Sequence, residues 1–431
     1  MYRNFILSCC VLFLSACSMV QEPVVKTEPK PYEKVFDQED LYILFALEAE
    51  RIHDYNSAEK LFTTLYEKSH KKEYLYRAVQ NELRLKKYEN VIARVDKYLQ
   101  GGLKDAELMR LKVIALTKLS RLKEAKKLAL EVASITQKPH DYIMVSNLYA
   151  QQKEYDLALK YLEGAYVKEY NEEILDKMAI ILYVNLGRKK DAIAQLESHA
   201  RIHGCSERIC MRLVSFYSDE NNIDGLLSVY KRMYAKFKSD AIARKIIQIY
   251  TYKREYFKLI DFLEENNIDD ALLFEVYAGV KDYKKASSVA LKLYEETADI
   301  NYLGQSALYK YEAFGKKITK KDLQDVIEKL QKVIKKKPDE TLYLNYLGYI
   351  LIDHGIDVKK GMDYVQKALK IEPNSAYYLD SLAWGYYKLG NCKRADEIIQ
   401  KVVALGEGDQ PEVKEHIEMI KKCLQNSKKG K

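Results

Sequence analysis

A repeat with a period of about 34 residues runs along most of this chain. Each repeat holds an apolar stretch, a short polar turn and a second apolar stretch that opens near a small residue. One marker position in the second stretch defines the repeats: Ala58, Val91, Ala125, Ala158, Ala192, Leu226, Leu259, Ala286, Gly361 and Ala395. The markers are evenly spaced except for one short and one long gap, before and after Ala286, that together equal three repeats. The spacing therefore predicts about eleven helical hairpins.

Tyrosine follows the same period. The residue nine positions before the marker is tyrosine in six repeats: Tyr149, Tyr183, Tyr217, Tyr250, Tyr277 and Tyr386. The chain has only 17 Gly and 7 Pro among 431 residues, which is few for a β-rich or loop-rich protein. Its formal net charge of +8 is spread along the sequence. Solvated, Lys-rich helix faces explain this charge, although anionic partners or a membrane surface would also suit it.

The last unit carries the most specific motif. Leu382, Ala383, Tyr386, Gly390 and Ala395 have the order and spacing of the tetratricopeptide repeat, which the chain resembles from Glu39 to Leu424. The resemblance implies an all-α, right-handed solenoid of about eleven hairpins, because hairpins that cannot bury their apolar faces alone stack on their neighbours. The amphipathic stretch that starts at Pro411 is expected to be the capping helix.

The first seventeen residues predict export. After Arg3, the apolar run from Phe5 to Leu14 is too short to span a bilayer. It ends in Leu14-Ser15-Ala16-Cys17, which resembles the bacterial lipobox, so Cys17 would carry the lipid, palmitate among its acyl chains. Ser18, where some Gram-negative lipoproteins have Asp, implies sorting to the outer membrane by the same resemblance. An ordinary secretory signal and retention in the inner membrane stay open.

These features predict a domain order. We expect a signal peptide at 1–16 and a lipidated, proline-containing tether at 17–38. A first repeat array at 39–299 is followed by the least regular repeat, at 300–337, which is a candidate hinge. The region 338–425 would hold two further repeats and the capping helix. A basic tail at 426–431 ends the chain.

The resemblance also places a protein-binding groove on the first helix of each repeat. Family positions 2, 5, 9, 12 and 13 correspond to Asn147, Gln151, Lys177, Asn185, Arg244, Gln248, Tyr252, Asn345, Tyr349, Tyr377, Asp380, Trp384, Tyr387 and Lys388. Amide side chains can pair with the backbone of an extended peptide, and Tyr and Trp supply rigid contact area. For most tyrosines the repeated spacing favours core packing instead. Trp384, Tyr387 and Asp380 fit groove and core equally well.

Four cysteines remain after Cys17. In an exported chain, Cys205, Cys210, Cys392 and Cys423 suggest disulfides, with a 392–423 bond stapling the end of the array. Free thiols are the alternative. His199 and His203 lie close to the first two cysteines, but their spacing matches no common zinc pattern, so we predict no metal.

The sequence contains no nucleotide-binding loop, nucleophile elbow or metalloprotease motif. We therefore expect neither an enzyme nor a cofactor. We also expect no nucleic-acid partner, because export separates the chain from nucleic acid and its lysines are not grouped with aromatic residues in a known module.

The leading hypothesis is a membrane-anchored periplasmic scaffold or adaptor that binds partner proteins in its concave groove. The run from Tyr377 to Trp384 resembles the final repeats of lipoprotein adaptors that deliver substrates to C-terminal processing proteases. A second version is a pilotin-like assembly factor for a pilus, a flagellar motor or a secretion complex. A third hypothesis, from another class, is an enzyme or metal protein that uses His199, His203 and the adjacent thiols.

Overall fold

The computed structural model describes residues 34–429, and this part of the chain is helical with no β-strand. It divides into two compact units, Met1–Glu220 and Asn221–Lys431. The predicted signal peptide, Cys17 and almost all of the predicted tether lie outside the described residues, as do the last two residues of the predicted basic tail. None of the helices in residues 34–429 combines the length and the apolar character needed to cross a membrane.

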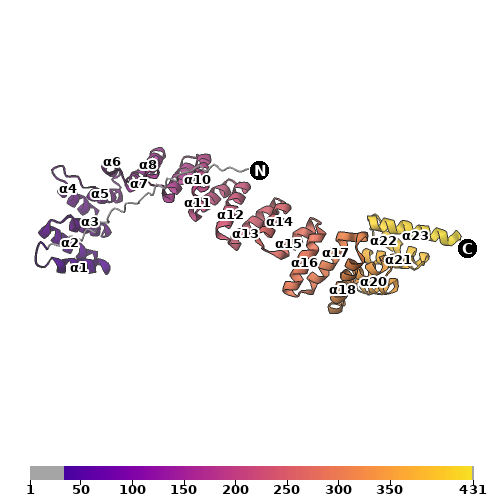
Figure 1. Cartoon of the computed structure of the whole chain (residues 1–431). Helices are drawn as coiled ribbons and strands as arrows, with labels where there is room; N and C mark the ends of the chain where they lie inside the picture. Colours follow the sequence, from indigo (N-terminus) through magenta and orange to yellow (C-terminus); the bar gives the residue numbers. More distant parts are fainter. Residues whose placement is uncertain (1–33, 430–431) are drawn as a thin grey trace, which may run out of the picture. The chain divides into compact units, whose positions relative to one another are not determined.

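The first unit contains five hairpins and one further helix (Figure 1). Its elements are α1 (Glu39–Arg51), α2 (Tyr55–Ser69), α3 (Lys72–Arg84), α4 (Tyr88–Tyr98), α5 (Ala106–Lys118), α6 (Leu122–Thr136), α7 (Pro139–Gln151), α8 (Tyr155–Lys168), α9 (Glu172–Ile180) with the π-helical turn η1 (Ile181–Asn185), α10 (Lys189–His203) and α11 (Glu207–Asp219). Each odd-numbered helix from α1 to α9 pairs with the even-numbered helix that follows it.

The second unit begins with α12, continues with five hairpins and ends with a single helix (Figure 1). Its elements are α12 (Ile223–Phe237), α13 (Asp240–Tyr252), α14 (Tyr256–Asn266), α15 (Asp270–Gly279), α16 (Tyr283–Thr297), α17 (Ile300–Phe314), the 3₁₀ turn η2 (Gly315–Lys317), α18 (Lys320–Lys336), α19 (Thr341–Asp353), α20 (Val358–Ile371), α21 (Ala376–Lys388), α22 (Cys392–Ala404) and α23 (Pro411–Lys429). The ten hairpins, together with α11 at the end of the first unit and α12 at the start of the second, contain the number of helices that eleven repeats require.

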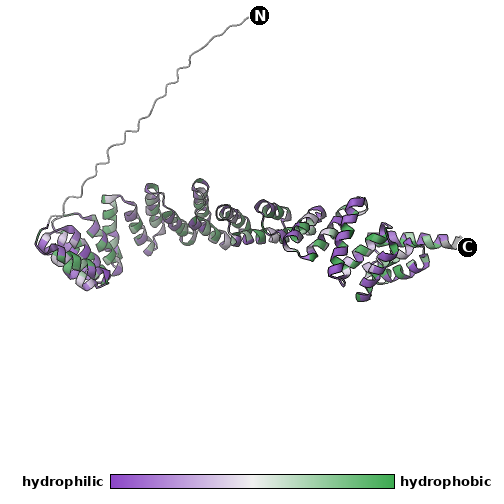
Figure 2. Ribbon diagram, turned by 60° about the horizontal axis from the view of Figure 1, so that its bottom comes forward, coloured by the Kyte–Doolittle hydropathy of each residue, from purple (hydrophilic) through white to green (hydrophobic). Residues whose placement is uncertain are grey.

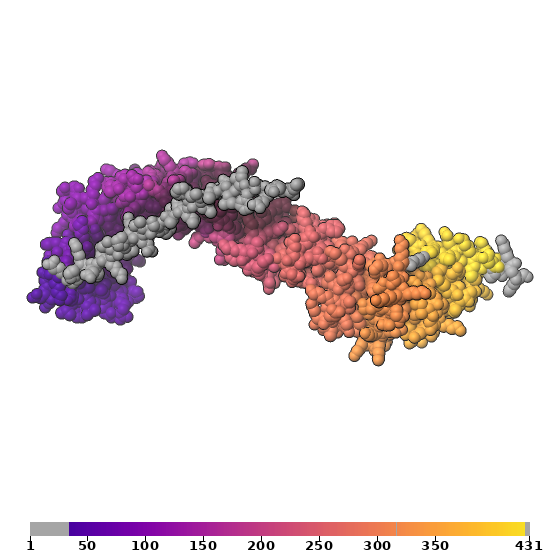
Figure 3. Space-filling view, viewed as in Figure 1, coloured from indigo at the N-terminus to yellow at the C-terminus, as the bar shows by residue number. Residues whose placement is uncertain are grey.

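The expected fold class is confirmed: each unit is a stack of tetratricopeptide-type helical hairpins, and α23 is the single helix after the last pair. Within a unit the colour changes gradually along the surface, because segments close in sequence lie close in space (Figure 3). The predicted irregular repeat at 300–337 is the pair α17 and α18 with η2 in its turn. The boundary between the units lies elsewhere, at Glu220, and the hinge at 300–337 stays a prediction.

One turn geometry recurs between the two helices of a hairpin. The residue five positions before the marker has a left-handed backbone in nine repeats: His53, Lys86, Ser120, Lys153, Gly187, Asn221, Arg254, Lys281 and Gly390. Glycine adopts this conformation without steric cost, whereas other L-residues lose about 1–2 kcal/mol there. The sequence singles out Gly187 and Gly390, but the turn is imposed even where lysine or arginine occupies the position.

In four of these repeats the residue after this turn caps the second helix with its side chain. Asp54, Asn222, Asp282 and Asn391 each accept a hydrogen bond from a backbone N–H three residues on, at distances of 2.9–3.2 Å. Such N-caps satisfy backbone donors that have no partner inside the helix, and each contributes about 1 kcal/mol. The polar turn residues of the repeat therefore fix where the second helix starts.

The marker residues lie where the helices pack most closely. Ala58, Ala125, Ala158, Ala192, Ala286 and Ala395 are fully buried, as is Val91. Hydrophobic and hydrophilic residues alternate along the helices (Figure 2), and most of the buried residues are apolar. At Gly361 the approach leaves no room for a side chain: a Cβ added there would lie 2.6 Å from the backbone oxygen of Gly348 in α19. Glycine at these two positions lets the backbones of α19 and α20 meet.

Neighbouring repeats of the first unit are also joined by buried ion pairs. Asp141 is fully buried and accepts two hydrogen bonds from the guanidinium of Arg110, at 2.7 and 2.9 Å. Burial alone would raise the pKa of Asp141, but the bonds from Arg110 and Thr136 outweigh it and the pKa is lowered. Asp176 and Arg212 form a similar pair between α9 and α11. These acidic groups thus have structural partners.

Replacing Gly361 by alanine tests the close contact. Gly361→Ala should lower the free energy of unfolding by about 1–3 kcal/mol, because the new methyl group forces α19 and α20 apart. The change is measured by urea unfolding followed by circular dichroism.

Gly279→Ala is the matched control. Gly279 ends α15 and has no atom within 4 Å of an added Cβ, so this variant should be as stable as the original chain or more stable by about 0.4–1 kcal/mol. Equal stability of the two variants would show that a methyl group at position 361 does not force α19 and α20 apart.

Candidate protein-binding groove

A groove of about 570 Å³ lies in the second unit, lined by α17, α19, α21 and α23. Three of these are first helices of successive repeats, and the fourth is the capping helix. Five tyrosines line it (Tyr311, Tyr346, Tyr349, Tyr377 and Tyr378), together with five carboxylic acids (Glu312, Asp353, Glu372, Asp380 and Glu412). Gly315, Leu342, Asn345, Ser375 and Ser381 complete the described lining. Its volume falls within the range of about 300–1,000 Å³ that ligand pockets usually have.

Two groove tyrosines donate hydrogen bonds to acidic partners. The hydroxyl of Tyr346 lies 2.8 Å from Oε1 of Glu312, and the hydroxyl of Tyr349 donates to Glu412 of the capping helix. Burial, reinforced by these carboxylates, holds the pKa of both phenols well above the usual value. Both hydroxyls therefore stay neutral near pH 7.

The capping helix is held against α21 by a buried polar and aromatic cluster. Nδ1 of His416 lies 2.9 Å from Oδ1 of Asp380, and both residues are buried. The Trp384 ring stacks on His416 at a centroid distance of 4.1 Å and on Tyr387 at 4.6 Å. Its Nε1 donates to Oδ1 of Asp353 at 2.9 Å. This cluster places Glu412 at the edge of the groove.

The structure brings together only part of the predicted site. Asn345, Tyr349, Tyr377 and Asp380 line the groove, whereas Trp384 is only 5% exposed and packs behind it. Tyr387 stacks on Trp384, and Lys388 donates to the backbone oxygen of Asp353 at 2.7 Å. The other predicted residues lie on other helices: Arg244, Gln248 and Tyr252 on α13, Asn147 and Gln151 on α7, Lys177 on α9 and Asn185 in η1.

Several lining residues were missed although the family positions contain them. Counted from the first residue of α17 and of α19, Tyr311, Glu312 and Asp353 occupy positions 12 and 13, and Leu342 occupies position 2. The signal is thus present. The repeat that starts at Ile300 is too irregular in sequence to align with the others, which explains why Tyr311 and Glu312 were missed. Leu342 and Asp353 lie in the same repeat as Asn345 and Tyr349, so the same count of positions could have found them. Glu412 could not be found in this way, because the capping helix lies outside the repeat.

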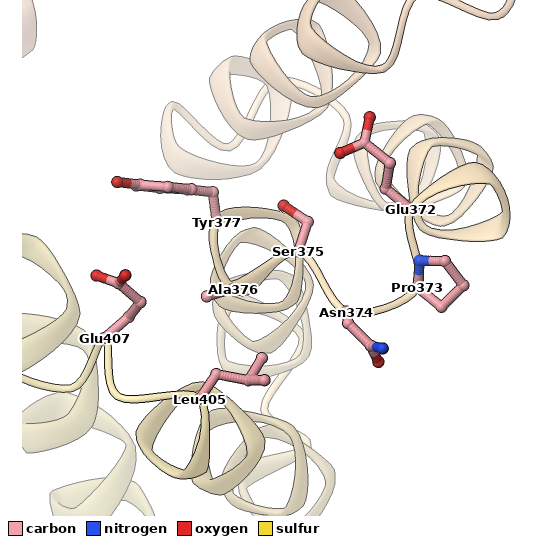
Figure 4. Close-up of a pocket in the computed structure, with 8 residues that line it drawn as sticks. All are labelled: Glu372, Pro373, Asn374, Ser375, Ala376, Tyr377, Leu405 and Glu407. Carbon is pink, nitrogen blue, oxygen red and sulfur yellow. The ribbon is translucent and has the colours of Figure 1, made fainter.

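A second hollow borders the groove. It is formed by the turn between α20 and α21, the start of α21 and the end of α22, and it shares Glu372, Ser375 and Tyr377 with the groove (Figure 4). In the close-up, the side chain of Glu372 points away from Leu405, and that of Tyr377 extends to the left of the helix. The shared residues therefore line both hollows.

The four cysteines form two pairs in the structure. Cys205 is bonded to Cys210, and Cys392 to Cys423, with Cα–Cα distances of 5.5 and 5.7 Å. The second bond joins the start of α22 to α23. It therefore helps to hold the helix that carries Glu412 and His416.

The histidines near the first disulfide have structural contacts. Nδ1 of His199 lies 3.1 Å from the hydroxyl of Tyr166, and Nε2 lies 3.2 Å from Glu172. The ring of His203 is 4.8 Å from that of His199. Within residues 34–429, no three His, Cys, Asp or Glu side chains are grouped so that they could hold a metal ion.

The fold is that of a tetratricopeptide-repeat protein. No family model matches the chain. A segment of 82 residues is 30% identical to "TPR repeat-containing protein PA4667" of Pseudomonas aeruginosa; the match covers 19% of this chain and only 14% of that protein.

Solved structures with similar helical arrays include one titled "Structure of Naa15/Naa10 bound to HypK-THB" and one titled "Crystal structure of APC/C hetero-tetramer Cut9-Hcn1". The match to the first has a TM-score of 0.33 and 11% sequence identity, and it covers 91% of this chain and 67% of the chain in that structure. The second has a TM-score of 0.34 at 12% identity and covers 90% of this chain and 97% of its own. Because both scores are low, the fold assignment rests on the hairpins themselves.

Alanine variants of Trp384 and Tyr377 should distinguish a residue that stabilises the fold from a residue on the surface. Trp384→Ala should lower the free energy of unfolding by about 3–5 kcal/mol, because a buried, stacked indole is removed. Tyr377 is 66% exposed, so Tyr377→Ala should change stability by no more than about 0.5 kcal/mol. Urea unfolding of both variants measures the difference. An unchanged stability of Trp384→Ala would mean that the cluster does not hold α23.

The Cys392–Cys423 bond should stabilise α23. The variant Cys392→Ser/Cys423→Ser lacks this bond, and hydrogen exchange in α23 should become faster. The reason is that closing a loop of 31 residues contributes about 3–4 kcal/mol to the free energy of unfolding. The control is Cys205→Ser/Cys210→Ser, which removes the bond of the first unit and should leave exchange in α23 unchanged. Equal protection of α23 in both double variants would contradict this role.

Proposed function

We propose that this protein is a scaffold that captures partner proteins in the groove of its second unit and holds them at a bacterial membrane through a lipid on Cys17. It acts by binding and carries out no reaction of its own. The observation that carries the proposal is the groove itself, in which five tyrosines from three first helices and a glutamate from the capping helix face one space. Tyrosine gives a protein contact large area for little loss of conformational entropy.

The groove also offers polar groups suited to a peptide backbone. Asn345 lies on its wall, and the side-chain oxygen of this residue is buried without a hydrogen-bond partner among the described residues. Leaving a buried amide unpaired costs about 1–3 kcal/mol, which a peptide N–H would recover on binding. An extended segment of a partner is therefore a better fit than a flat protein surface.

The envelope location rests on the sequence and is compatible with the cysteines. The run Leu14-Ser15-Ala16-Cys17 resembles a lipobox, and Ser18 favours the outer membrane, with the chain facing the periplasm. Disulfides such as Cys392–Cys423 are typical of exported proteins. A lipid anchor would raise the concentration of captured proteins near the membrane, which is how a scaffold without catalytic groups promotes a reaction between its partners.

Two roles follow for such a scaffold. One is an adaptor that brings substrates to a C-terminal processing protease, which the run from Tyr377 to Trp384 favours by resemblance. The other is a pilotin-like assembly factor for a pilus, a flagellar motor or a secretion complex. Both use the same groove and the same anchor, so the identity of the captured partners distinguishes them.

Cross-linking in living cells, followed by affinity capture and mass spectrometry, tests the proposal. The original chain should retain a defined set of periplasmic proteins. In the variant Tyr349→Phe/Tyr377→Ala, the amount of captured protein should fall at least about ten-fold. This corresponds to a loss of about 1.4 kcal/mol in binding free energy. A protease recovered with its substrates would indicate the adaptor, whereas pilus, motor or secretin subunits would indicate the assembly factor.

The controls separate the groove from the anchor. Tyr170→Ala removes a tyrosine that is 71% exposed in the first unit, and capture should be unaffected. Cys17→Ser should move the protein out of the membrane fraction while its purified form still binds partners. Undiminished capture by the groove variant, with full helicity, would show that partners bind elsewhere.

A further inference from the structure

We infer that the groove recognises a cationic segment of its partner, with lysine or arginine side chains directed at the carboxylates of Glu312, Glu372 and Glu412. This inference rests on the proposed function, because it specifies the chemistry of the segment that the scaffold binds.

The first observation is the sign of the charge. The chain as a whole has a formal net charge of +8, yet the groove is lined by five carboxylic acids, and none of its described lining residues is lysine or arginine. Two of the five acids have basic neighbours, Asp353 with Lys388 at 3.5 Å and Asp380 with His416 at 2.9 Å, which leaves Glu312, Glu372 and Glu412. The local charge is therefore opposite to that of the whole chain. A concave surface with one sign of charge attracts ligands of the opposite sign.

The second observation concerns the partners of the acids. The donors that the structure places on Glu312, Glu372 and Glu412 are neutral hydroxyl groups, those of Tyr346, Thr341 and Tyr349. A hydroxyl donor orients a carboxylate without neutralising its charge. These acids are thus held in position while their negative charge remains available to a ligand.

Asn345 is a separate indication that the groove binds a ligand. This residue is 9% exposed, lies on the same wall as Tyr346 and Tyr349, and has an unpartnered, buried side-chain oxygen. Buried polar atoms are rarely left unpaired unless a ligand or water completes them. Once the Asn345 amide turns toward the groove, a backbone N–H of a bound segment would satisfy this oxygen, while the side chains of the segment reach the acids.

The tyrosines suit the same ligand. The phenols of Tyr346 and Tyr349 are neutral near pH 7, as tyrosine is even at its ordinary pKa of about 10, so they present aromatic faces and no additional charge. Aromatic faces attract lysine and arginine side chains through cation–π interactions. The groove thus combines carboxylates for the charge with rings for the aliphatic and guanidinium parts of a basic side chain.

The test uses the purified full-length mature chain and three labelled twelve-residue peptides that alternate serine with lysine, glutamine or glutamate. Fluorescence anisotropy should show the lysine peptide binding at least about ten-fold more tightly than the glutamine peptide, as expected for complementary charge at a groove. The glutamate peptide should bind most weakly. Equal binding of the lysine and glutamine peptides would overturn the inference.

Charge-neutral variants identify the groups. The variant Glu312→Gln/Glu412→Gln keeps the side-chain shapes. It should weaken binding of the lysine peptide by about ten-fold and leave binding of the glutamine peptide unchanged. The matched control, Glu328→Gln/Glu418→Gln, removes the same net charge from exposed positions on α18 and α23 and should change binding less than two-fold. Circular dichroism verifies that all variants remain folded.

The outcomes separate this inference from the proposed function. If Tyr349→Phe/Tyr377→Ala abolishes capture in cells but Glu312→Gln/Glu412→Gln binds the lysine peptide like the original chain, the groove binds proteins and the cationic preference is wrong. If lysine selectivity is lost equally in the control variant, the preference comes from general charge and not from the groove. Asn345→Ala should weaken the lysine and glutamine peptides alike, since it contacts the backbone.

Discussion

Close packing between helices at one marker position per repeat, which is Ala or Gly in most repeats, is the constraint on which this structure depends. A single hairpin cannot bury its apolar face, so the next hairpin must cover it. Ala158 and Ala286 are fully buried at this contact, and Gly361 lets two backbones meet. The turns then follow from the packing, since a left-handed residue connects the two helices in nine repeats and a side-chain N-cap starts the second helix in four of them.

The same packing creates the groove at the end of the second unit. Successive first helices bring their equivalent positions to one side, and α23 closes the end of the stack. Asp380, His416 and Trp384 hold that helix in place from behind the groove, and the disulfide from Cys392 to Cys423 joins it to α22. The residues with the greatest structural role are thus next to the residues that can contact a partner.

The helix pattern could be predicted because its causes are local. The spacing of the markers, the polar turns and the recurring tyrosines all act within one repeat. The groove was predicted only in part. Tyr349, Tyr377 and Asp380 line it as expected, but Trp384 does not, since it stacks on His416 of the capping helix, which lies outside the repeat. Tyr311 and Glu312 were missed although they occupy groove positions, because their repeat is irregular in sequence.

The helical hairpins, their number and the positions at which they pack follow from the sequence alone, because a period of about 34 residues is compatible with few other folds. The sequence also contains the export-signal pattern and the lipobox-like run on which the envelope proposal rests. Which side chains share the groove depends instead on how the helices stack. Its negative lining comes from α17, α19, α21 and α23 together, and no single repeat contains that set. The charge of a groove depends on residues that are neighbours in space. The repeat spacing alone does not show which residues these are, because they become neighbours only when the helices stack.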